Sequence, residues 1–327
     1  MTGPGVSAAW RLFCFNWLPL GLMAVVLAAG LSLTGFSIGP IGPIGPIGII
    51  ASVAFGAVYG GVAWYNAWAP HRRDPQVVFA LGSTAQVVLI TMVMTPMTYV
   101  AAATNLPMQD ATLLAIDRAL GLDWVAFAAF VDQHPALAAW LSYGYSMIRW
   151  PIFGIPVLLA WAGLYLRLQE FTLAFLLALI ITAFVSALVP AIGVFQQLGL
   201  DPASFENLSP GAYLHQLRDL PAVREGSLRE LELLSLGGIV TFPSFHAASA
   251  LLFTWALWPL RWVRPLAIAA NGAMLASTPL DGGHYFIDLA AGLAVAAVAI
   301  ALARRTSAWC VRRDAAASFA GAGVPAE

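Results

Sequence analysis

The chain lacks lysine altogether and carries few charges of either sign. Only 9% of its 327 residues are charged, and all 15 basic residues are arginine. The formal net charge is −1, and no block of basic residues resembles a nucleic-acid-binding tail. The sequence therefore excludes nucleic acid as a partner.

Cysteine is almost as scarce. Cys14 and Cys310 lie near opposite ends of the chain, and neither stands in a CxxC pair or beside a histidine. Such spacing indicates neither a disulfide framework nor a zinc site. We therefore predict no metal ion.

Apolar residues, by contrast, are in excess. They make up 60% of the chain, and the mean hydropathy is +0.82. Apolar runs of about 18 or more residues recur, each long enough to cross roughly 30 Å of hydrocarbon. We predict an all-α, polytopic transmembrane helix bundle.

About eight membrane spans can be placed along the chain. They cover residues 12–36, 47–69, 76–103, 137–166, 170–195, 244–262, 264–281 and 284–304. The Ile-Gly-Pro repeat at 38–47 cannot continue a helix, because proline lacks the backbone N–H, so it predicts a tight connector. Residues 307–327, rich in Ala and Gly from 314, are expected to form a disordered tail.

The arginines predict the orientation of these spans. With a cytoplasmic N-terminus, 10 arginines lie inside and 4 outside, while Arg149 falls within a span. Both termini are then cytoplasmic, and the polar stretches 104–136 and 196–243 are external. We expect an integral protein of a bacterial inner membrane, with its site on the external, periplasmic side.

Two segments place histidines at the external ends of apolar spans. In the first, Pro243 starts a helix, so Ser244 and His246 lie in its first turn beside unpaired backbone N–H groups. Such a helix start can bind an anion. A purely interfacial or structural role for the histidine is the alternative interpretation.

The second segment contains His284 and Asp288, which are four residues apart. On one helix face the carboxylate can hold an imidazole N–H, which is the arrangement of a base and the group that orients it. Gly282 and Gly283 allow a ligand to approach the backbone closely. Because both segments open to the same side, we predict a single site.

These motifs resemble those of a known family. Phe242-Pro243-Ser244-Phe245-His246-Ala247 and Gly282-Gly283-His284-Tyr285-Phe286-Ile287-Asp288, continuing to Gly292, are similar to signatures of the type 2 phosphatidic acid phosphatase superfamily. Within it, the pattern most resembles the branch that includes inositol phosphorylceramide synthase, an inositolphosphotransferase. Ile116-Asp117-Arg118-Ala-Leu-Gly121 resembles a segment of that branch. The likeness spans about residues 110–304.

The resemblance implies a lipid phosphatase or phosphotransferase with a six-helix core within residues 76–306, preceded by two additional helices in residues 1–75. His284 would attack phosphorus, Asp288 would orient it, and His246 would protonate the leaving group. Ser244 and Gly283 would contact the phosphate. The implied partner is a lipid phosphate or phospholipid in the membrane, with no metal and no cofactor.

The chain departs from the superfamily pattern at its cations. The first signature, Lys-x6-Arg-Pro, has no counterpart, and Thr278 replaces the arginine of the third. Another cation should then neutralise the phosphoryl group. Arg149 is our first candidate, because an intramembrane arginine is usually functional. The external-loop arginines compete for this role: Arg218, Arg224 and Arg229.

Several functional alternatives stay open at this stage. Water as the acceptor makes a phosphatase, whereas a lipid or polyol hydroxyl makes a phosphotransferase. A transporter or channel lined by the same polar residues is a different class, as is a catalytically inactive scaffold. A transporter predicts inverted repeats and broken helices at the membrane midplane, whereas these motifs gather at one end.

Overall fold

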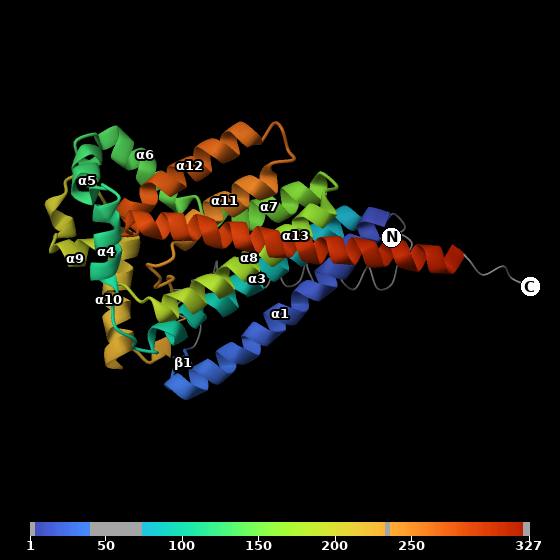
Figure 1. Cartoon of the computed structure of the whole chain (residues 1–327), viewed down its shortest axis with the longest axis horizontal. Coiled ribbons are helices and arrows are strands. Elements are labelled where there is room, and N and C mark those ends of the chain that lie inside the picture. Colours follow the sequence, from blue (N-terminus) through green and yellow to red (C-terminus); the bar gives the residue numbers. More distant parts are fainter. Residues whose placement is uncertain (1–3, 40–73, 233–235, 323–327) are drawn as a thin grey trace, which may run out of the picture.

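The computed structural model describes residues 4–39, 74–232 and 236–322, and there the chain is almost wholly helical (Figure 1). The α-helices are α1 (Pro4–Thr34), α3 (Pro75–Ala102), α4 (Asp110–Ala119), α5 (Trp124–Asp132), α6 (Pro135–Ser146), α7 (Arg149–Trp161), α8 (Tyr165–Leu188), α9 (Val194–Leu198), α10 (Gly211–Glu225), α11 (Phe245–Leu257), α12 (Arg264–Asp281) and α13 (Phe286–Ala322). A 3-10 turn forms at Pro202–Ser204. Two short strands, β1 (Ser37–Ile38) and β2 (Glu230–Leu231), pair in parallel. The predicted all-α fold is confirmed.

Four of the described helices are long and apolar enough to cross a membrane. They are the segments Val6–Thr34, Pro75–Ala102, Tyr165–Leu188 and Phe286–Arg313. Helix α8 packs against α1, α3 and α13, so these helices form one bundle (Figure 1). Their length and composition are those of membrane-spanning helices.

The predicted count of eight spans is not confirmed. Helix α11 is shorter than the four long helices, and the predicted span 47–69 lies outside the described residues. The predicted span 137–166 is two helices, α6 and α7, separated at Met147 and Ile148. Pro151 explains this break, because it cannot donate an N–H to the carbonyl of Met147 one helical turn earlier.

Two further boundaries differ from the sequence predictions. Helix α8 begins at Tyr165 and ends at Leu188, several residues before the predicted limits of 170–195. Helix α13 continues to Ala322, well beyond the predicted end of the last span at 304 and into the stretch 307–327 that was expected to be a tail. Alanine has the highest intrinsic helix propensity, which lets the last apolar span continue without a break.

Buried polar side chains fasten α1 to the rest of the bundle. The amide of Gln169 on α8 donates to the Ser83 hydroxyl of α3 at 2.7 Å, and Asn16 of α1 donates to the Gln169 side chain at 3.3 Å. Gln86 of α3 also donates to the carbonyl of Phe13 at 2.9 Å. Hydrogen bonds of this kind hold membrane helices together where the hydrophobic effect does not.

The shorter connecting helices gather at one end of the bundle. Helices α4, α5, α9 and α10 lie there together, whereas α1 begins and α13 ends at the opposite end (Figure 1). Helices α4, α5 and α10 belong to the stretches 104–136 and 196–243 that the sequence assigns to one side, and α9 begins two residues before the second stretch. Both histidine motifs also lie at this end, because α11 and α13 begin there (Figure 1).

Candidate active site

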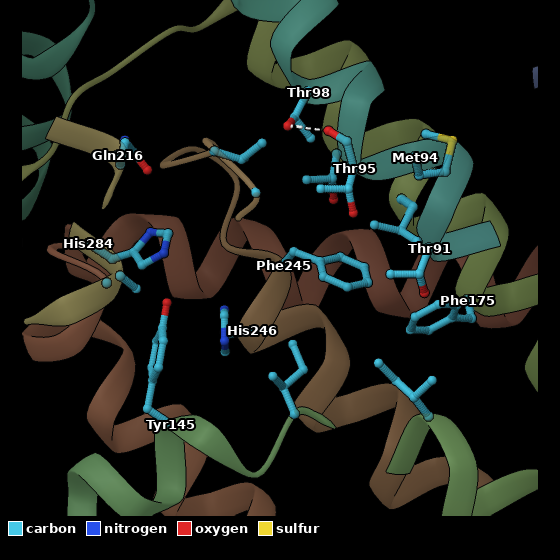
Figure 2. A pocket seen from close by; sticks show the side chains of 18 residues that line it. Thr91, Met94, Thr95, Thr98, Tyr145, Phe175, Gln216, Phe245, His246 and His284 are labelled. Carbon is cyan, nitrogen blue, oxygen red and sulfur yellow. Dashed lines mark hydrogen bonds between the residues drawn. The ribbon is translucent and has the colours of Figure 1, made fainter. Parts of the chain in front are cut away.

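His246 and His284 line the same cavity, which has a volume of about 230 Å³. Figure 2 shows both rings in the same part of the view, beside Tyr145. The outer wall is largely apolar and comes from α3, α7 and α8, with Met94, Ile152 and Phe175 among its residues. This arrangement is consistent with the single site that the two motifs predict.

The turn between α12 and α13 positions His284. Gly283 adopts a φ of +64°, a conformation that side-chain-bearing residues rarely take. Its carbonyl accepts a hydrogen bond from the Val194 N–H at 2.8 Å. At Gly282, an added Cβ would lie 2.5 Å from Cδ2 of His284. The two glycines thus make the turn and leave room for the imidazole.

Asp288 contacts the imidazole ring of His284 through Nδ1. Nδ1 of His284 lies 3.1 Å from Oδ2 of Asp288, and the same oxygen accepts the Tyr285 N–H at 2.9 Å. Both side chains are buried. A carboxylate can only accept hydrogen bonds, so the proton sits on Nδ1 and Nε2 keeps its lone pair. The contact that the four-residue spacing predicted is present.

Helix α4 fixes the start of α13 through a second carboxylate. Asp117 accepts the backbone N–H groups of Phe286 and Ile287 at 2.7 and 2.8 Å. Burial raises the pKa of Asp117 above its usual value, while these two donors act in the opposite direction. Asp117 therefore caps the start of α13, which lies two residues after His284. This contact gives the Ile116–Gly121 segment a structural role.

Asp110 secures the other side of the same turn. Its carboxylate accepts the N–H of Ile192 at 3.0 Å and of Gly193 at 2.9 Å, together with the Tyr285 hydroxyl at 2.9 Å. Sequence reasoning missed this residue. The available signal was the seven-residue spacing of Asp110 and Asp117, which places two acidic side chains on one face of an amphipathic helix.

Replacing Asp117 with alanine is expected to lower kcat about tenfold with little change in KM, because a displaced His284 would still meet substrate but in poorer geometry. Losing the cap should also cost about 1 kcal/mol of stability. Asp123→Ala is the matched control, since Asp123 caps α5 through the Ala126 N–H at 3.0 Å. Steady-state kinetics and thermal unfolding should show stability losses in both variants but a kcat loss only for Asp117→Ala. Equal kcat in the two would contradict this role.

Ser244 and Gly292 set the start of α11 against α13. Ser244 is the N-cap, its Oγ accepting the Ala247 N–H at 3.4 Å, and its own N–H donates to the Asp288 carbonyl at 3.0 Å. At Gly292 an added Cβ would lie 2.2 Å from the Ser244 carbonyl oxygen. Only glycine permits this close approach, which brings the two motifs together.

His246 lies in the first turn of α11, and its ring stacks on Tyr145 of α6. The ring centroids are 3.9 Å apart and the planes differ by 15°. Tyr145 was not found by sequence reasoning, because nothing near it in the chain distinguishes it. The cavity also contains Thr91, Thr95 and Thr98, which their spacing places on one face of α3.

The structure separates the other predicted phosphate contacts from the cavity wall. Ser244 precedes Phe245, and Gly283 lies between Gly282 and His284, but neither Ser244 nor Gly283 lines the cavity. Arg149 does not line it either: it is exposed, at the first residue of α7. The structure does not show Arg149 buried among other helices, because the break before α7 places it at an exposed helix start.

The external arginines are engaged elsewhere. Nε of Arg218 donates to Asp219 at 2.6 Å, and Nη2 of Arg224 donates to the Leu106 carbonyl at 2.8 Å. Nη1 of Arg229 donates to the Thr34 carbonyl at 3.1 Å. Thr278, at the position of the missing signature arginine, is buried and bonds to the Met274 carbonyl at 2.7 Å. Among the described residues, no arginine lines the cavity.

Long apolar helices surround a histidine–carboxylate pair and a second histidine, an arrangement that is compatible with a membrane protein. The sequence matches the PAP2 superfamily over residues 111–302, which is more than half of the chain. The chain belongs to the PAP2 superfamily, and this membership indicates a lipid phosphatase-like membrane protein. Searches of curated proteins and of solved structures gave no match.

Proposed function

We propose that this protein is a membrane lipid phosphate phosphatase or lipid phosphotransferase that works through a phosphohistidine on His284. The observation that carries the proposal is the contact of 3.1 Å between Nδ1 of His284 and Oδ2 of Asp288. His284 also lines the same cavity as His246. A histidine held in this way offers Nε2 as a nucleophile.

In the first step, the Nε2 lone pair attacks phosphorus, and a P–N bond forms while the P–O bond to the leaving group breaks. His246 must carry a proton when the substrate is bound, and it gives that proton to the leaving oxygen. Asp288 keeps the proton on Nδ1 and stabilises the positive charge that develops on the imidazole.

In the second step, His246 removes a proton from the acceptor, whose oxygen attacks phosphorus as the P–N bond breaks. From a lipid phosphate, water as the acceptor yields inorganic phosphate, and an alcohol as the acceptor yields the phosphomonoester of that alcohol. His284 and His246 return to their starting states, so the cycle balances. The scheme uses no metal and no cofactor.

Ser244 and Gly283 contribute through the backbone in this proposal. Ser244 caps α11 and thereby orients its first turn, whose N–H groups form the positive end of a helix dipole. Gly283 sets the turn that presents His284. Both positions therefore shape the polar end of the cavity where the phosphate would lie.

The apolar wall supports a lipid as substrate. Met94, Ile152 and Phe175 line the cavity beyond the histidines, so an acyl chain could lie there while its phosphate reaches the polar end. The motif resemblance to inositol phosphorylceramide synthase favours transfer to a hydroxyl over hydrolysis.

The products decide between the two reactions. We would give the purified protein a short-chain phosphatidic acid with and without inositol, and separate free phosphate from inositol phosphate. Either product supports the proposed function, and an inositol phosphate that forms when inositol is present identifies transfer. If neither forms from this substrate or from other short-chain lipid phosphates, a transporter or an inactive scaffold becomes the better account.

We further propose that the site faces the periplasmic side of a bacterial inner membrane, with both termini cytoplasmic. In a variant with Cys14 and Cys310 replaced by serine, Ala203→Cys should react with a membrane-impermeant maleimide in intact spheroplasts. Ala162→Cys, which follows α7 near the start of α3, should react only after permeabilisation. Both residues are exposed. The reverse labelling pattern would overturn the orientation.

A further inference from the structure

The described part of the cavity wall contains no arginine or lysine that could balance the charge of a phosphate. A transferring phosphoryl group spreads negative charge over three oxygens, which catalysts stabilise with cations or aligned hydrogen-bond donors. Among the described residues that line the cavity, none is arginine, and the chain contains no lysine. Apart from the two histidines, the donors must therefore be neutral groups of the cavity wall.

Tyr145 is placed to be one of these donors. Figure 2 shows its hydroxyl pointing into the cavity, toward the space beside the His284 ring. Its ring is fixed by stacking on His246 at 3.9 Å. The backbone is fixed as well, because a Cβ added at neighbouring Gly144 would lie 2.8 Å from Cβ of Ala273 on α12. The hydroxyl is thus held at the reacting end of the cavity.

Several other polar side chains in the wall already donate to protein groups. The Gln216 amide donates to the carbonyls of Ala191 and Ile192, each at 3.2 Å, and to the Thr241 hydroxyl. The hydroxyls of Thr91 and Thr98 donate to backbone carbonyls of their own helix at 3.0 and 2.7 Å. The hydroxyls of Tyr145 and Thr182 have no hydrogen-bond partner among the described residues. Tyr145 is the one that stacks on His246, so its proton is available to a ligand beside the histidines.

We propose that the Tyr145 hydroxyl donates a hydrogen bond to a non-bridging oxygen of the transferring phosphoryl group and so serves where relatives with the full signatures use a cation. This inference rests on the proposed function. A neutral hydroxyl suits the site, because an unpaired arginine inside a membrane bundle is costly to bury. A donor that is already oriented needs no rearrangement as charge develops.

Tyr145→Phe is the direct test, because phenylalanine keeps the stacking on His246 and removes only the hydroxyl. Loss of one such donor should lower kcat roughly 100-fold, while KM for short-chain phosphatidic acid stays within about threefold. Tyr143→Phe is the matched control: Tyr143 is on the same helix but is 72% exposed. That variant should keep wild-type kcat, and both should unfold near the wild-type temperature.

Orthovanadate provides a readout that does not depend on turnover, because it adopts the five-coordinate geometry of phosphoryl transfer. Calorimetric titration should show vanadate affinity reduced at least about tenfold in Tyr145→Phe and unchanged in Tyr143→Phe. Wild-type kcat in Tyr145→Phe would overturn the proposal, as would a kcat loss with unchanged vanadate affinity. If wild-type protein turns over no lipid phosphate, the proposed function fails, and the vanadate affinities still decide the role of Tyr145.

Discussion

Replacing His284 with alanine is expected to abolish turnover, lowering kcat at least about 1000-fold, because the group that forms the covalent intermediate is lost. Among the residues that the structure describes, no other combines a buried carboxylate partner with a place in the cavity wall. Phosphate release from short-chain phosphatidic acid, measured with protein purified from membranes, is the readout.

The control for this variant is His134→Ala. His134 is exposed at the N-cap of α6, where Nδ1 lies 2.6 Å from the Phe130 carbonyl. It should retain wild-type activity, and both variants should be recovered from the membrane in equal amounts. If His284→Ala keeps more than about a tenth of wild-type kcat, a loss of under about 1.4 kcal/mol in transition-state stabilisation, His284 is not the nucleophile.

Gly282→Ala is expected to cause the second-largest loss, because the added methyl group occupies space that the His284 ring needs. The new Cβ would lie 2.5 Å from Cδ2 and 2.9 Å from Nε2 of that ring. The ring must move, and a displacement of about 1 Å at a reacting group costs on the order of 100-fold in rate. Steady-state kinetics should show the loss in kcat.

Gly272→Ala provides the comparison within the same helix. No atom lies within 4 Å of a Cβ added there, so alanine should leave kcat unchanged and raise stability slightly through its higher helix propensity. Wild-type kcat in Gly282→Ala would show that the ring tolerates displacement, and it would contradict the positioning of Nε2 described above.

The sequence predicted some helices well for a simple physical reason. The predicted spans 76–103 and 264–281 correspond to α3 (Pro75–Ala102) and α12 (Arg264–Asp281), each of which begins with proline at one of its first two positions. Proline there marks a helix start and needs no N–H partner. The break before α7 was missed because the apolar run continues through it, and hydropathy does not register a missing backbone hydrogen bond.

The site was only partly visible in the sequence. His284 and Asp288 were found because their spacing is local, and a four-residue separation predicts contact near a helix start. Tyr145 reaches the site through packing between helices distant in the chain, so no short-range pattern reveals it, whereas the spacing of Asp110 and Asp117 was a signal that was not used. Arg149 was selected because the eight-span topology placed it within the membrane, and the helix break removes that reason.

Trapping the covalent intermediate tests the central claim most directly. Protein mixed with ³²P-labelled short-chain phosphatidic acid would be quenched in alkali within milliseconds, and labelled peptides would be mapped by mass spectrometry. The account predicts an alkali-stable, acid-labile phosphoramidate on His284 that forms and decays at rates compatible with turnover and is missing from His284→Ala. Product formation without any phosphorylated histidine, or label on a different residue, would contradict it.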